Sequence, residues 1–397
     1  MGRWVPPVHS PVSVRSLAAG ATAAAGLARV ARPELHARLS TLFSARDVLL
    51  TDSGTSALVL ALRAVAKTGA AVAFPAFACI DLTAAAIRAG VNIRLYDVEP
   101  ATMSPDLSSL RAACARGVQA IVIAPLYGYP VDFRGVSSIA REHGVPVIED
   151  AAQSAGAELE GTRVGAFGEL SVLSFGRGKG TTTGAGGAIL VRDAAFAAAA
   201  AAANVQVAQR GWRPLIALTA QWLLARPSLF ALPASIPALK LGEMVYHDAA
   251  EPRAISVAGA QMLSAALAAD RAEIRHRRER AAQLTVAAER SDRFAPVTPI
   301  TGAMPGYLRL AVLDVAGSAT PAPRAGVLRA YPMTLDEHPR TTPLLLAGEA
   351  AGPGARTLRD RLFTLPTHSR ASAADTRALV QWLTASIAPQ PAPALAP

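Results

Sequence analysis

The pattern of apolar and polar positions between residues 47 and 193 predicts strands that alternate with helices. "DVLLT" (47–51) is a short strand, followed by a turn of small residues and a helix that ends at Gly69. Four apolar runs come next, and helical segments of roughly 10–15 residues separate them, which is typical of parallel βαβ units in a doubly wound sheet. The runs are "AVAFPAF" (71–77), "NIRLYDVE" (92–99), "AIVIAPL" (120–126) and "VPVIEDAA" (145–152). "SVLSF" (171–175) and "GAILVRD" (187–193) are two further strands on either side of a lysine-containing turn.

Outside this block the pattern is more varied. Residues 1–12 are rich in proline and indicate an arm or loop, whereas the alanine-rich residues 18–44 indicate helix broken at glycine and proline. We expect a long helix at 256–290, a closing helix at 374–387, and a disordered proline-rich end at 391–397.

Residues 212–245 are strongly apolar, but four prolines and Arg226 interrupt them. Because no uncharged span of about 18 residues remains, we exclude a membrane-spanning helix. Two interpretations stay open. The segment is either a pair of short helices that is buried or covered in a dimer, or a peripheral contact in the plane of a membrane.

The composition permits a large core and weighs against a nucleic-acid partner. Of the 397 residues, 51% are hydrophobic and 17% are charged, enough for a large domain with a smaller second one. The net charge of +10 suits an anionic partner, but the arginines are scattered. Their one cluster, at 271–280, lacks the interleaved aromatic residues of a single-strand binder. We therefore expect small-molecule ligands and no nucleic acid.

Cysteine and histidine usage exclude further classes of protein. Cys79 and Cys114 form no CxxC pair, and no histidine cluster has metal-ligand spacing, so we expect neither a disulfide framework nor a metal site. Prolines near the N-terminus interrupt the apolar core that a signal peptide needs. We expect a cytoplasmic protein, with membrane association left open through 212–245.

One lysine is unusual for this chain. The stretch "LSFGRGKGTTTGAGGAIL" (173–190) carries Lys179 among glycines and threonines, and the only other lysines are Lys67 and Lys240. Arginine supplies the positive charge elsewhere, so a need for charge alone would predict arginine here. A lysine amine can lose its proton and attack a carbonyl, which a guanidinium cannot do. Lys179 is therefore a candidate nucleophile.

This stretch does not match the nucleotide-binding glycine loops. A P-loop requires glycine, four residues, and then Gly-Lys-Ser/Thr, but Leu173 occupies the first glycine position and Gly180 follows Lys179. No GxGxxG sequence opens the first helix, which excludes the dinucleotide fingerprint as well.

Two other motifs supply what such a lysine needs in a cofactor site. "DSGTSAL" (52–58) opens a helix with small residues that can hold a phosphate, although such a sequence is also a common N-cap. In "VPVIEDAAQS" (145–154) a strand ends in Glu149 and Asp150. A carboxylate at the edge of the core needs a partner, which is either a bound cation or, if the carboxylate is structural, an arginine or backbone N–H groups. An amine, a carboxylate and a phosphate site together match pyridoxal 5'-phosphate, which needs a Schiff-base amine, an acid at its pyridine nitrogen and an anion site.

These motifs carry a resemblance to a known family. From about residue 45 to 387 the sequence resembles the DegT/DnrJ/EryC1/StrS aminotransferases, the sugar-aminotransferase branch of fold-type I pyridoxal phosphate enzymes. The resemblance implies an α/β fold with a large, mostly parallel doubly wound domain (1–250, with the insert 212–245) and a smaller C-terminal α+β domain (251–390). It also implies active sites at a homodimer interface. It rests on "SGTSAL", "FPAFACIDLTAAAIRAG", "LYGYPVDF", the block 148–190 and "LFTLPTHSRASAADTRALVQWL".

The resemblance implies a role for six residues. Lys179 would form the Schiff base with pyridoxal phosphate and move protons, and Asp150 would pair with the pyridine nitrogen. Gln153 would hydrogen-bond near the ring hydroxyl. The phosphate would be bound by Ser174 together with the Gly54-Thr55 turn.

The sequence departs from the family at several positions. The ring-stacking aromatic residue of the family falls on Cys79, so either Phe77 takes over part of the stacking or smaller side chains cover the cofactor. The glutamate of the family's "GEGG" is Ala185, and Pro125 replaces the histidine before "LYG". "EPRAIS" (251–256) replaces an asparagine-tyrosine-arginine run, so the phosphate contact from the second subunit has no assigned residue.

As a member of this family, the protein would move an amino group, with glutamate as the expected donor, to a keto group of a nucleotide-activated sugar. Such enzymes would supply nucleotide sugars for cell-surface polysaccharide. The presence of lysine favours amino transfer over the family's dehydratases, in which histidine replaces it. A non-sugar or lipid-linked substrate, and a non-catalytic scaffold or regulatory role, remain alternatives. We expect Tyr127 to line the site or the core, and a diphosphate to be held near the mouth by His338, Arg340 and His368.

Overall fold

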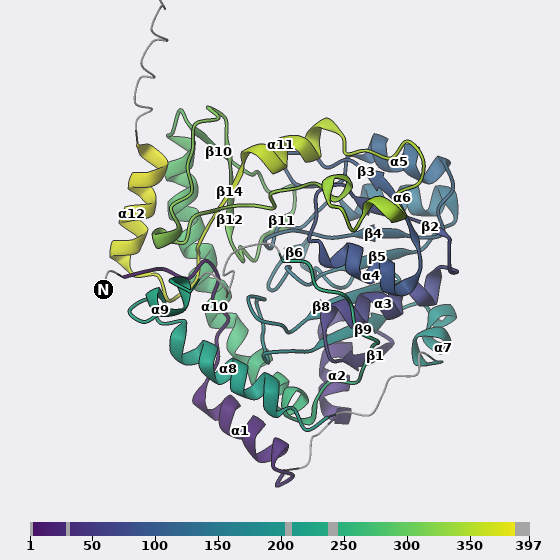
Figure 1. The fold of residues 1–397 in the computed structure, drawn as a ribbon, viewed down its shortest axis with the longest axis horizontal. Helices are drawn as coiled ribbons and strands as arrows, with labels where there is room; N and C mark the ends of the chain where they lie inside the picture. Colours follow the sequence, from purple (N-terminus) through teal and green to yellow (C-terminus); the bar gives the residue numbers. More distant parts are fainter. Residues whose placement is uncertain (1–2, 29–31, 203–208, 237–244, 386–397) are drawn as a thin grey trace, which may run out of the picture.

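The computed structural model describes residues 3–28, 32–202, 209–236 and 245–385. Within these ranges the chain builds a seven-stranded sheet in the order β1-β9-β8-β5-β4-β2-β3 (Figure 1). Strands β3, β2, β4, β5 and β8 are parallel, whereas β9 is antiparallel to both of its neighbours, β8 and β1. The strands are β1 Asp47–Thr51, β2 Ala71–Pro75, β3 Asn92–Tyr96, β4 Ile121–Ile123, β5 Val147–Asp150, β8 Leu170–Ser174 and β9 Gly187–Val191. The predicted parallel doubly wound sheet is confirmed.

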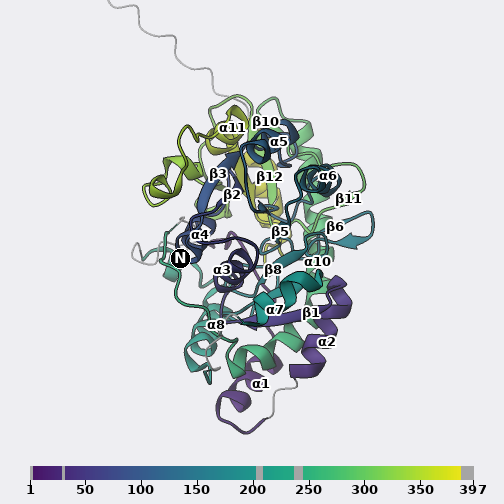
Figure 2. The same cartoon turned by 90° about the vertical axis from the view of Figure 1, so that its right-hand side faces the viewer.

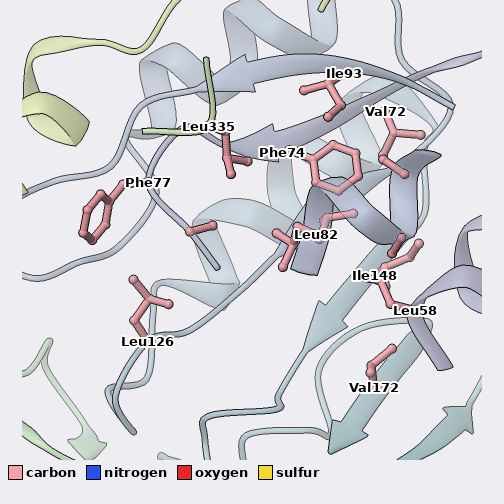
Figure 3. Packing of buried hydrophobic residues seen from close by; sticks show 14 of the residues in the cluster. Leu58, Val72, Phe74, Phe77, Leu82, Ile93, Leu126, Ile148, Val172 and Leu335 are labelled. Atoms are coloured by element: carbon pink, nitrogen blue, oxygen red, sulfur yellow. The ribbon is translucent and has the colours of Figure 1, made fainter. Parts of the chain in front are cut away.

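Helices cover both faces of this sheet because successive strand residues point to opposite sides. Val72 and Phe74 pack with α3 and α4 in one apolar cluster, whereas Ala73 packs with α5 and α6 in another (Figure 3). Two-sided burial explains why these strands are continuously apolar in the sequence. The helices are α3 Gly54–Val65, α4 Asp81–Ala89, α5 Leu107–Ala115, α6 Phe133–His143 and α7 Ala194–Ala202.

The end of α3 differs from the sequence prediction. The helix stops at Val65, and Ala66 already has an extended backbone. Gly69, expected at the helix end, has φ +79° and forms the turn that leads into β2. Glycine is required there because the turn needs a left-handed backbone conformation, not because it caps the helix.

A second, antiparallel sheet has the order β10-β12-β14-β13 and packs against α10 and α12. Its core contains Phe294, Phe363 and the ring of Trp382, with Phe294 and Trp382 stacked at 4.5 Å between ring centroids. The long helix α10 begins after Ser256, whose side chain accepts from the Gly259 N–H, close to the predicted 256–290. The elements are α10 Val257–Glu289, β10 Phe294–Pro296, β12 Leu310–Asp314, β13 Leu328–Arg329, α11 Pro353–Arg361, β14 Leu362–Leu365 and α12 Ala373–Thr384.

Short elements complete the described chain. A small sheet in the order β11-β6-β7 brings residues 303–304 beside residues 158–163. The strands are β6 Glu158–Leu159, β7 Thr162–Arg163 and β11 Ala303–Met304, and the 3₁₀ helices are η2 Pro323–Ala325, η3 Leu335–Glu337 and η4 Thr342–Leu344. The domain boundary at residue 250 stays a prediction, because α10 contacts helices beside the large sheet as well as β10 and α12.

The N-terminal arm, residues 3–13, has no regular structure and lies along the C-terminal sheet region. The Val5 N–H donates to the Arg324 carbonyl at 2.9 Å, and the Trp4 N–H donates to the Pro227 carbonyl at 3.1 Å. After the arm, α1 Val14–Ala24 packs on α10, and α2 Arg32–Phe43 leads into β1. The predicted arm is confirmed. The helical region is interrupted after Ala24, beside Gly26, but Gly20 lies within α1 and Pro33 within the first turn of α2, so neither of these two breaks the helix.

The apolar insert forms two helices, α8 Trp212–Leu224 and α9 Ala231–Ala234, up to Ile236. Both α1 and α8 lie at the lower end of the molecule in Figures 1 and 2. The rest of the predicted insert, residues 237–244, and the predicted disordered end at 391–397 lie outside the described residues. Among the helices described, none has the length and apolar character needed to cross a membrane.

Candidate functional site

The six residues singled out in the sequence line one cleft. The cleft lies where β4, β5 and β8 end and α3 begins, because parallel strands bring their carboxyl ends to one edge of the sheet. The six residues are Gly54, Thr55, Asp150, Gln153, Ser174 and Lys179.

The start of α3 forms a tight cradle beside Ser174. The Ser53 side chain caps the helix by accepting from the Ser56 N–H at 3.0 Å, which leaves the N–H groups of the first turn directed out of the helix. A Cβ on Gly54 would lie 2.6 Å from the Ser174 Cβ and 2.8 Å from its Oγ. Only glycine therefore fits, and the hydroxyl lies at the positive end of a helix, an arrangement that suits an anion.

The two carboxylates at the end of β5 serve different purposes. Glu149 is fully buried and accepts from the N–H groups of Gly165 at 2.6 Å and Phe167 at 2.9 Å, and from the Ser171 hydroxyl at 2.7 Å. Glu149 is therefore a structural carboxylate, because backbone N–H groups and a hydroxyl satisfy it. Asp150, one residue later, points to the opposite side of the sheet and lines the cleft.

The Asp150 carboxylate would be stabilised by a further hydrogen-bond donor in the cleft. Its carboxylate accepts from the Ala152 N–H at 3.1 Å. Burial raises the pKa of Asp150, and the nearby Lys179 ammonium opposes this rise. A cationic N–H donor in the cleft would stabilise the charged form of this carboxylate.

Lys179 lies in the loop between β8 and β9 and lines both the cleft and an adjoining cavity. The loop is closed by a bridge between Gly176 and Gly184, and the Lys179 N–H donates to the Gly176 carbonyl at 3.4 Å. From the N-terminal arm, the Ser10 hydroxyl donates to the Lys179 carbonyl. The arm thus contacts the segment that carries the amine.

Gln153 connects the cleft to the adjoining cavity. Its Nε2 donates to the Tyr331 hydroxyl at 2.6 Å, and its Oε1 accepts from the Tyr127 N–H at 3.3 Å. The rings of Tyr127 and Tyr331 lie 6.2 Å apart. Tyr127, expected in the site or in the core, meets both descriptions because it is buried and lines the adjoining cavity.

The adjoining cavity, of about 310 Å³, joins distant parts of the chain. The arm contributes Pro7 and Val8, and the C-terminal sheet contributes Arg309 and Tyr331. Arg309 is buried and donates to the carbonyls of Gly326 at 2.9 Å and Thr364 at 2.7 Å, and also to Pro7. Burial lowers the pKa of Arg309 to about 10, so it stays charged at neutral pH. Sequence reasoning missed Arg309 and Tyr331, since neither lies in a recognisable motif.

The stacking position of the family is occupied by small side chains. Cys79 lines the cleft, and so does Asp81, which sequence reasoning also missed. Burial raises the pKa of Cys79 to about 12, so its thiol stays protonated at neutral pH. Phe77 instead packs against the Tyr331 ring at 5.4 Å and lies in the apolar cluster (Figure 3). Of the two alternatives, the structure favours coverage by smaller side chains.

The three residues expected at the mouth do not line the cleft or the adjoining cavity. His368 is fully buried, with its Nε2 at 2.7 Å from the Pro6 carbonyl, so its side chain holds the arm. His338 and Arg340 instead lie against the ring of Tyr246. A histidine or arginine outside a motif gives no sequence signal of which contacts it will make, and this prediction was wrong.

Comparison with known proteins agrees with this arrangement. Residues 31–216 match the model of the DegT/DnrJ/EryC1/StrS aminotransferase family. Over 144 residues the chain is 37% identical to UDP-N-acetyl-3-dehydro-alpha-D-glucosamine 3-aminotransferase of Acidithiobacillus ferrooxidans, covering 36% of this chain and 39% of that protein. Over 146 residues it is 34% identical to L-glutamine:2-deoxy-scyllo-inosose aminotransferase of Streptomyces lividus, covering 36% and 34%. The matched part thus spans between a third and two fifths of these curated relatives.

The likeness of fold extends much further. The structure of GDP-4-keto-6-deoxy-D-mannose-3-dehydratase of E. coli with bound hydrated PLP superposes with a TM-score of 0.75 at 14% identity, covering 97% of this chain and 100% of that one. At this identity the likeness concerns the fold alone. The match to the DegT/DnrJ/EryC1/StrS aminotransferase family model is confined to residues 31–216, somewhat less than half of the chain.

Proposed function

We propose that this protein is a pyridoxal phosphate-dependent aminotransferase that acts on a keto group of a nucleotide-activated sugar, with glutamate as the amino donor. One observation carries the proposal: the only lysine of the glycine loop and the carboxylate that ends β5 line the same cleft as the cradle at the start of α3. Amine, acid and anion site are the three groups that this cofactor requires.

The residues of the cleft fit the cofactor. The cradle that a Cβ on Gly54 would fill suits the phosphate, with Ser174 and Thr55 beside it. Asp150 would pair with the pyridine nitrogen, Gln153 would contact the ring hydroxyl, and Lys179 would hold the aldehyde carbon. When bound, pyridoxal phosphate supplies an electrophilic aldehyde and a protonated ring that withdraws electrons.

Residues of the chain itself would keep the ring protonated, transfer a proton to the substrate and orient the ring. Asp150 would keep the ring nitrogen protonated, because a buried carboxylate with a raised pKa gains most from a cationic partner. The Lys179 amine, at the boundary between cleft and adjoining cavity, would move a proton to and from the substrate carbon. Gln153, held by Tyr331 and Tyr127, would orient the ring.

The adjoining cavity supports an anionic acceptor of moderate size. Its volume of about 310 Å³ is at the lower end of the range of cofactor and substrate pockets. Arg177 lies in the same loop as Lys179, is exposed at the rim of the cavity and can meet a phosphate group. Relatives named as aminotransferases of a UDP-sugar and of an inosose favour a sugar-like acceptor.

Cofactor attachment gives the first test. The purified protein with pyridoxal phosphate should show the absorbance of a lysine-bound cofactor, and borohydride reduction should add the cofactor mass to the peptide that contains Lys179. Lys179→Ala should lose both signals, whereas Lys67→Ala, which alters an unrelated lysine, should keep them. Retention of the covalent mass in Lys179→Ala would contradict the proposal.

Amino transfer gives the second test. Glutamate should convert the bound cofactor to its amino form with release of 2-oxoglutarate, and a nucleotide-linked keto sugar should restore the starting absorbance. Glutamine should be assayed in parallel, because a curated relative is named for it. If neither amino acid changes the spectrum of a cofactor-loaded protein, the proposed reaction is wrong.

A further inference from the structure

Exposed apolar side chains of the described residues concentrate in a few helices. Of the twelve large hydrophobic side chains exposed in the described residues, seven come from α1, α8, α9 and the turns beside them. We call these seven the apolar face. They are Val14, Leu27, Trp212, Ile216, Leu223, Leu232 and Ile236.

Helix α8 is apolar on two sides, and only one side is covered. Leu215 and Leu218 pack with Ala24 of α1 and Met262 of α10. Ile216, on the outer side of α8, is 64% exposed, and Trp212 and Leu223 on the same side are 45% and 44% exposed. Apolar side chains exposed together on one side of a helix form a patch of the kind that marks interaction sites.

The charged residues of the two segments that carry the apolar face have a single sign. Residues 3–28 and 209–236 contain no aspartate and no glutamate. They contain five arginines, of which Arg15, Arg210 and Arg213 are exposed next to the apolar residues. The Arg226 guanidinium lies over the ring of Trp222 at 4.9 Å. Helices that lie at a lipid interface typically combine apolar and tryptophan side chains with basic residues and lack acidic ones.

We propose that the apolar face docks in the plane of an anionic lipid bilayer. A second copy of this chain is a poorer occupant, because a two-fold contact between these two segments would set arginines against arginines, and residues 3–28 and 209–236 contain no acidic residue to pair them. An anionic lipid surface supplies both the apolar phase and the opposite charge. The proposal is independent of the proposed aminotransferase activity.

The apolar face is built directly onto the loop that carries Lys179. A Cβ on Gly184, in that loop, would lie 2.6 Å from the Pro214 carbonyl oxygen and 3.0 Å from the Leu218 Cβ of α8. The arm also reaches both parts, since Trp4 donates to the Pro227 carbonyl and Ser10 to the Lys179 carbonyl. Docking of α8 would therefore hold the cleft in one orientation to the lipid surface.

Co-sedimentation of the full chain with vesicles tests the proposal. The protein should bind to vesicles of phosphatidylcholine mixed with phosphatidylglycerol. It should bind far less to vesicles of phosphatidylcholine alone. Ile216→Gln/Leu223→Gln should lower the partition coefficient at least about tenfold, because two apolar side chains no longer enter the interface. Arg210→Gln/Arg213→Gln should lower it by about fivefold per arginine at low salt, and added salt should reduce that difference.

The matched control changes two exposed valines outside the apolar face. Val286→Gln/Val315→Gln alters side chains of 45% and 58% exposure and should bind like the unaltered protein. No binding to anionic vesicles, equal binding to neutral vesicles, or undiminished binding by Ile216→Gln/Leu223→Gln would each overturn the proposal. So would light scattering in which this variant changes the oligomeric state, because the face would then be a subunit contact.

Discussion

The cofactor cleft and the adjoining cavity share Lys179, Gln153 and Cys79, yet they are assembled in different ways. The cleft uses residues 54–179, which one parallel sheet brings together at the carboxyl ends of its strands. The adjoining cavity combines the arm at residues 7–8 with residues 308–364 from the C-terminal region. Sheet topology alone positions the first site, whereas the second exists only while both ends of the chain are docked.

The contacts that hold the arm explain this dependence. The arm has no regular hydrogen-bonding pattern of its own, so buried side chains satisfy its carbonyls: His368 bonds to Pro6 and Arg309 bonds to Pro7. The cleft instead depends on helix ends and strand ends. Changes in the cleft should therefore affect cofactor chemistry, and changes in the arm or at Tyr331 should affect substrate recognition.

The largest effect is expected for Asp150→Asn. The neutral amide cannot hold a protonated ring nitrogen, so the rate of amino transfer should fall by about a hundredfold or more, measured with glutamate as donor. The free energy of unfolding of the cofactor-free protein at pH 7 should rise instead. Burial raises the pKa of Asp150, so its carboxylate lowers stability above that pKa, and this cost disappears as the carboxyl group is protonated on lowering the pH.

The neighbouring carboxylate supplies the control. Glu149→Gln places an amide donor where four donors converge, and should lower the free energy of unfolding by about 1–3 kcal/mol. A destabilised, cofactor-free Asp150→Asn protein, measured by urea denaturation, would show that Asp150 is structural like Glu149.

Gly54→Ala should weaken cofactor binding by about tenfold to a hundredfold, because the new methyl group would overlap Ser174 in the cradle. Titration of the cofactor-free protein with pyridoxal phosphate measures the effect. Gly176→Ala is the matched control, since its Cβ would meet only the Ser174 Oγ, at an ordinary 3.6 Å. Equal loss in both variants would show that the loop, not the cradle, determines affinity.

A smaller effect is expected for Tyr331→Phe in the adjoining cavity. Loss of the hydrogen bond with Gln153 should lower kcat/KM for the acceptor by about threefold to tenfold and leave the cofactor absorbance intact. Steady-state kinetics measures this effect, and Tyr246→Phe is the control. Tyr246 bonds to Asp248 and lines neither the cleft nor the adjoining cavity, so loss of its hydroxyl should leave kcat/KM unchanged. A loss of cofactor binding in Tyr331→Phe would mean that the two regions are not separable.

The smallest effect at neutral pH concerns the arm. Burial lowers the pKa of His368 to about 3 and that of His9 to about 4, so both are neutral in the folded protein at pH 7. Their contribution to stability is present above about pH 6.5, the ordinary histidine value, and is lost as the pH falls toward 4. Proteolysis of the arm should therefore accelerate between pH 7 and pH 5.

His368→Gln should reduce that acceleration, because an amide still donates to the Pro6 carbonyl but does not titrate. His247→Gln, at an exposed position, should retain it. An arm whose cleavage rate does not change with pH would show that these two histidines do not control its docking.

The strands, the long helix after Ser256 and the cleft residues could be predicted from the sequence because their signals are local. Apolar runs of strand length, a serine N-cap and small residues at a helix start act within a few positions of where they occur. The different surroundings of Glu149 and Asp150 could also be predicted from the sequence, since adjacent strand residues point to opposite faces.

Only the tertiary structure decided which distant residues meet. His368 and Pro6 are far apart in sequence, as are Gln153 and Tyr331, and no local pattern marks such pairs. The sequence by itself determined the parallel sheet and the amine, acid and anion site at its edge. Packing of the chain's two ends decided the wall of the adjoining cavity, the placement of Phe77 against Tyr331 and the side of α8 left uncovered, because these depend on long-range contacts with no sequence periodicity.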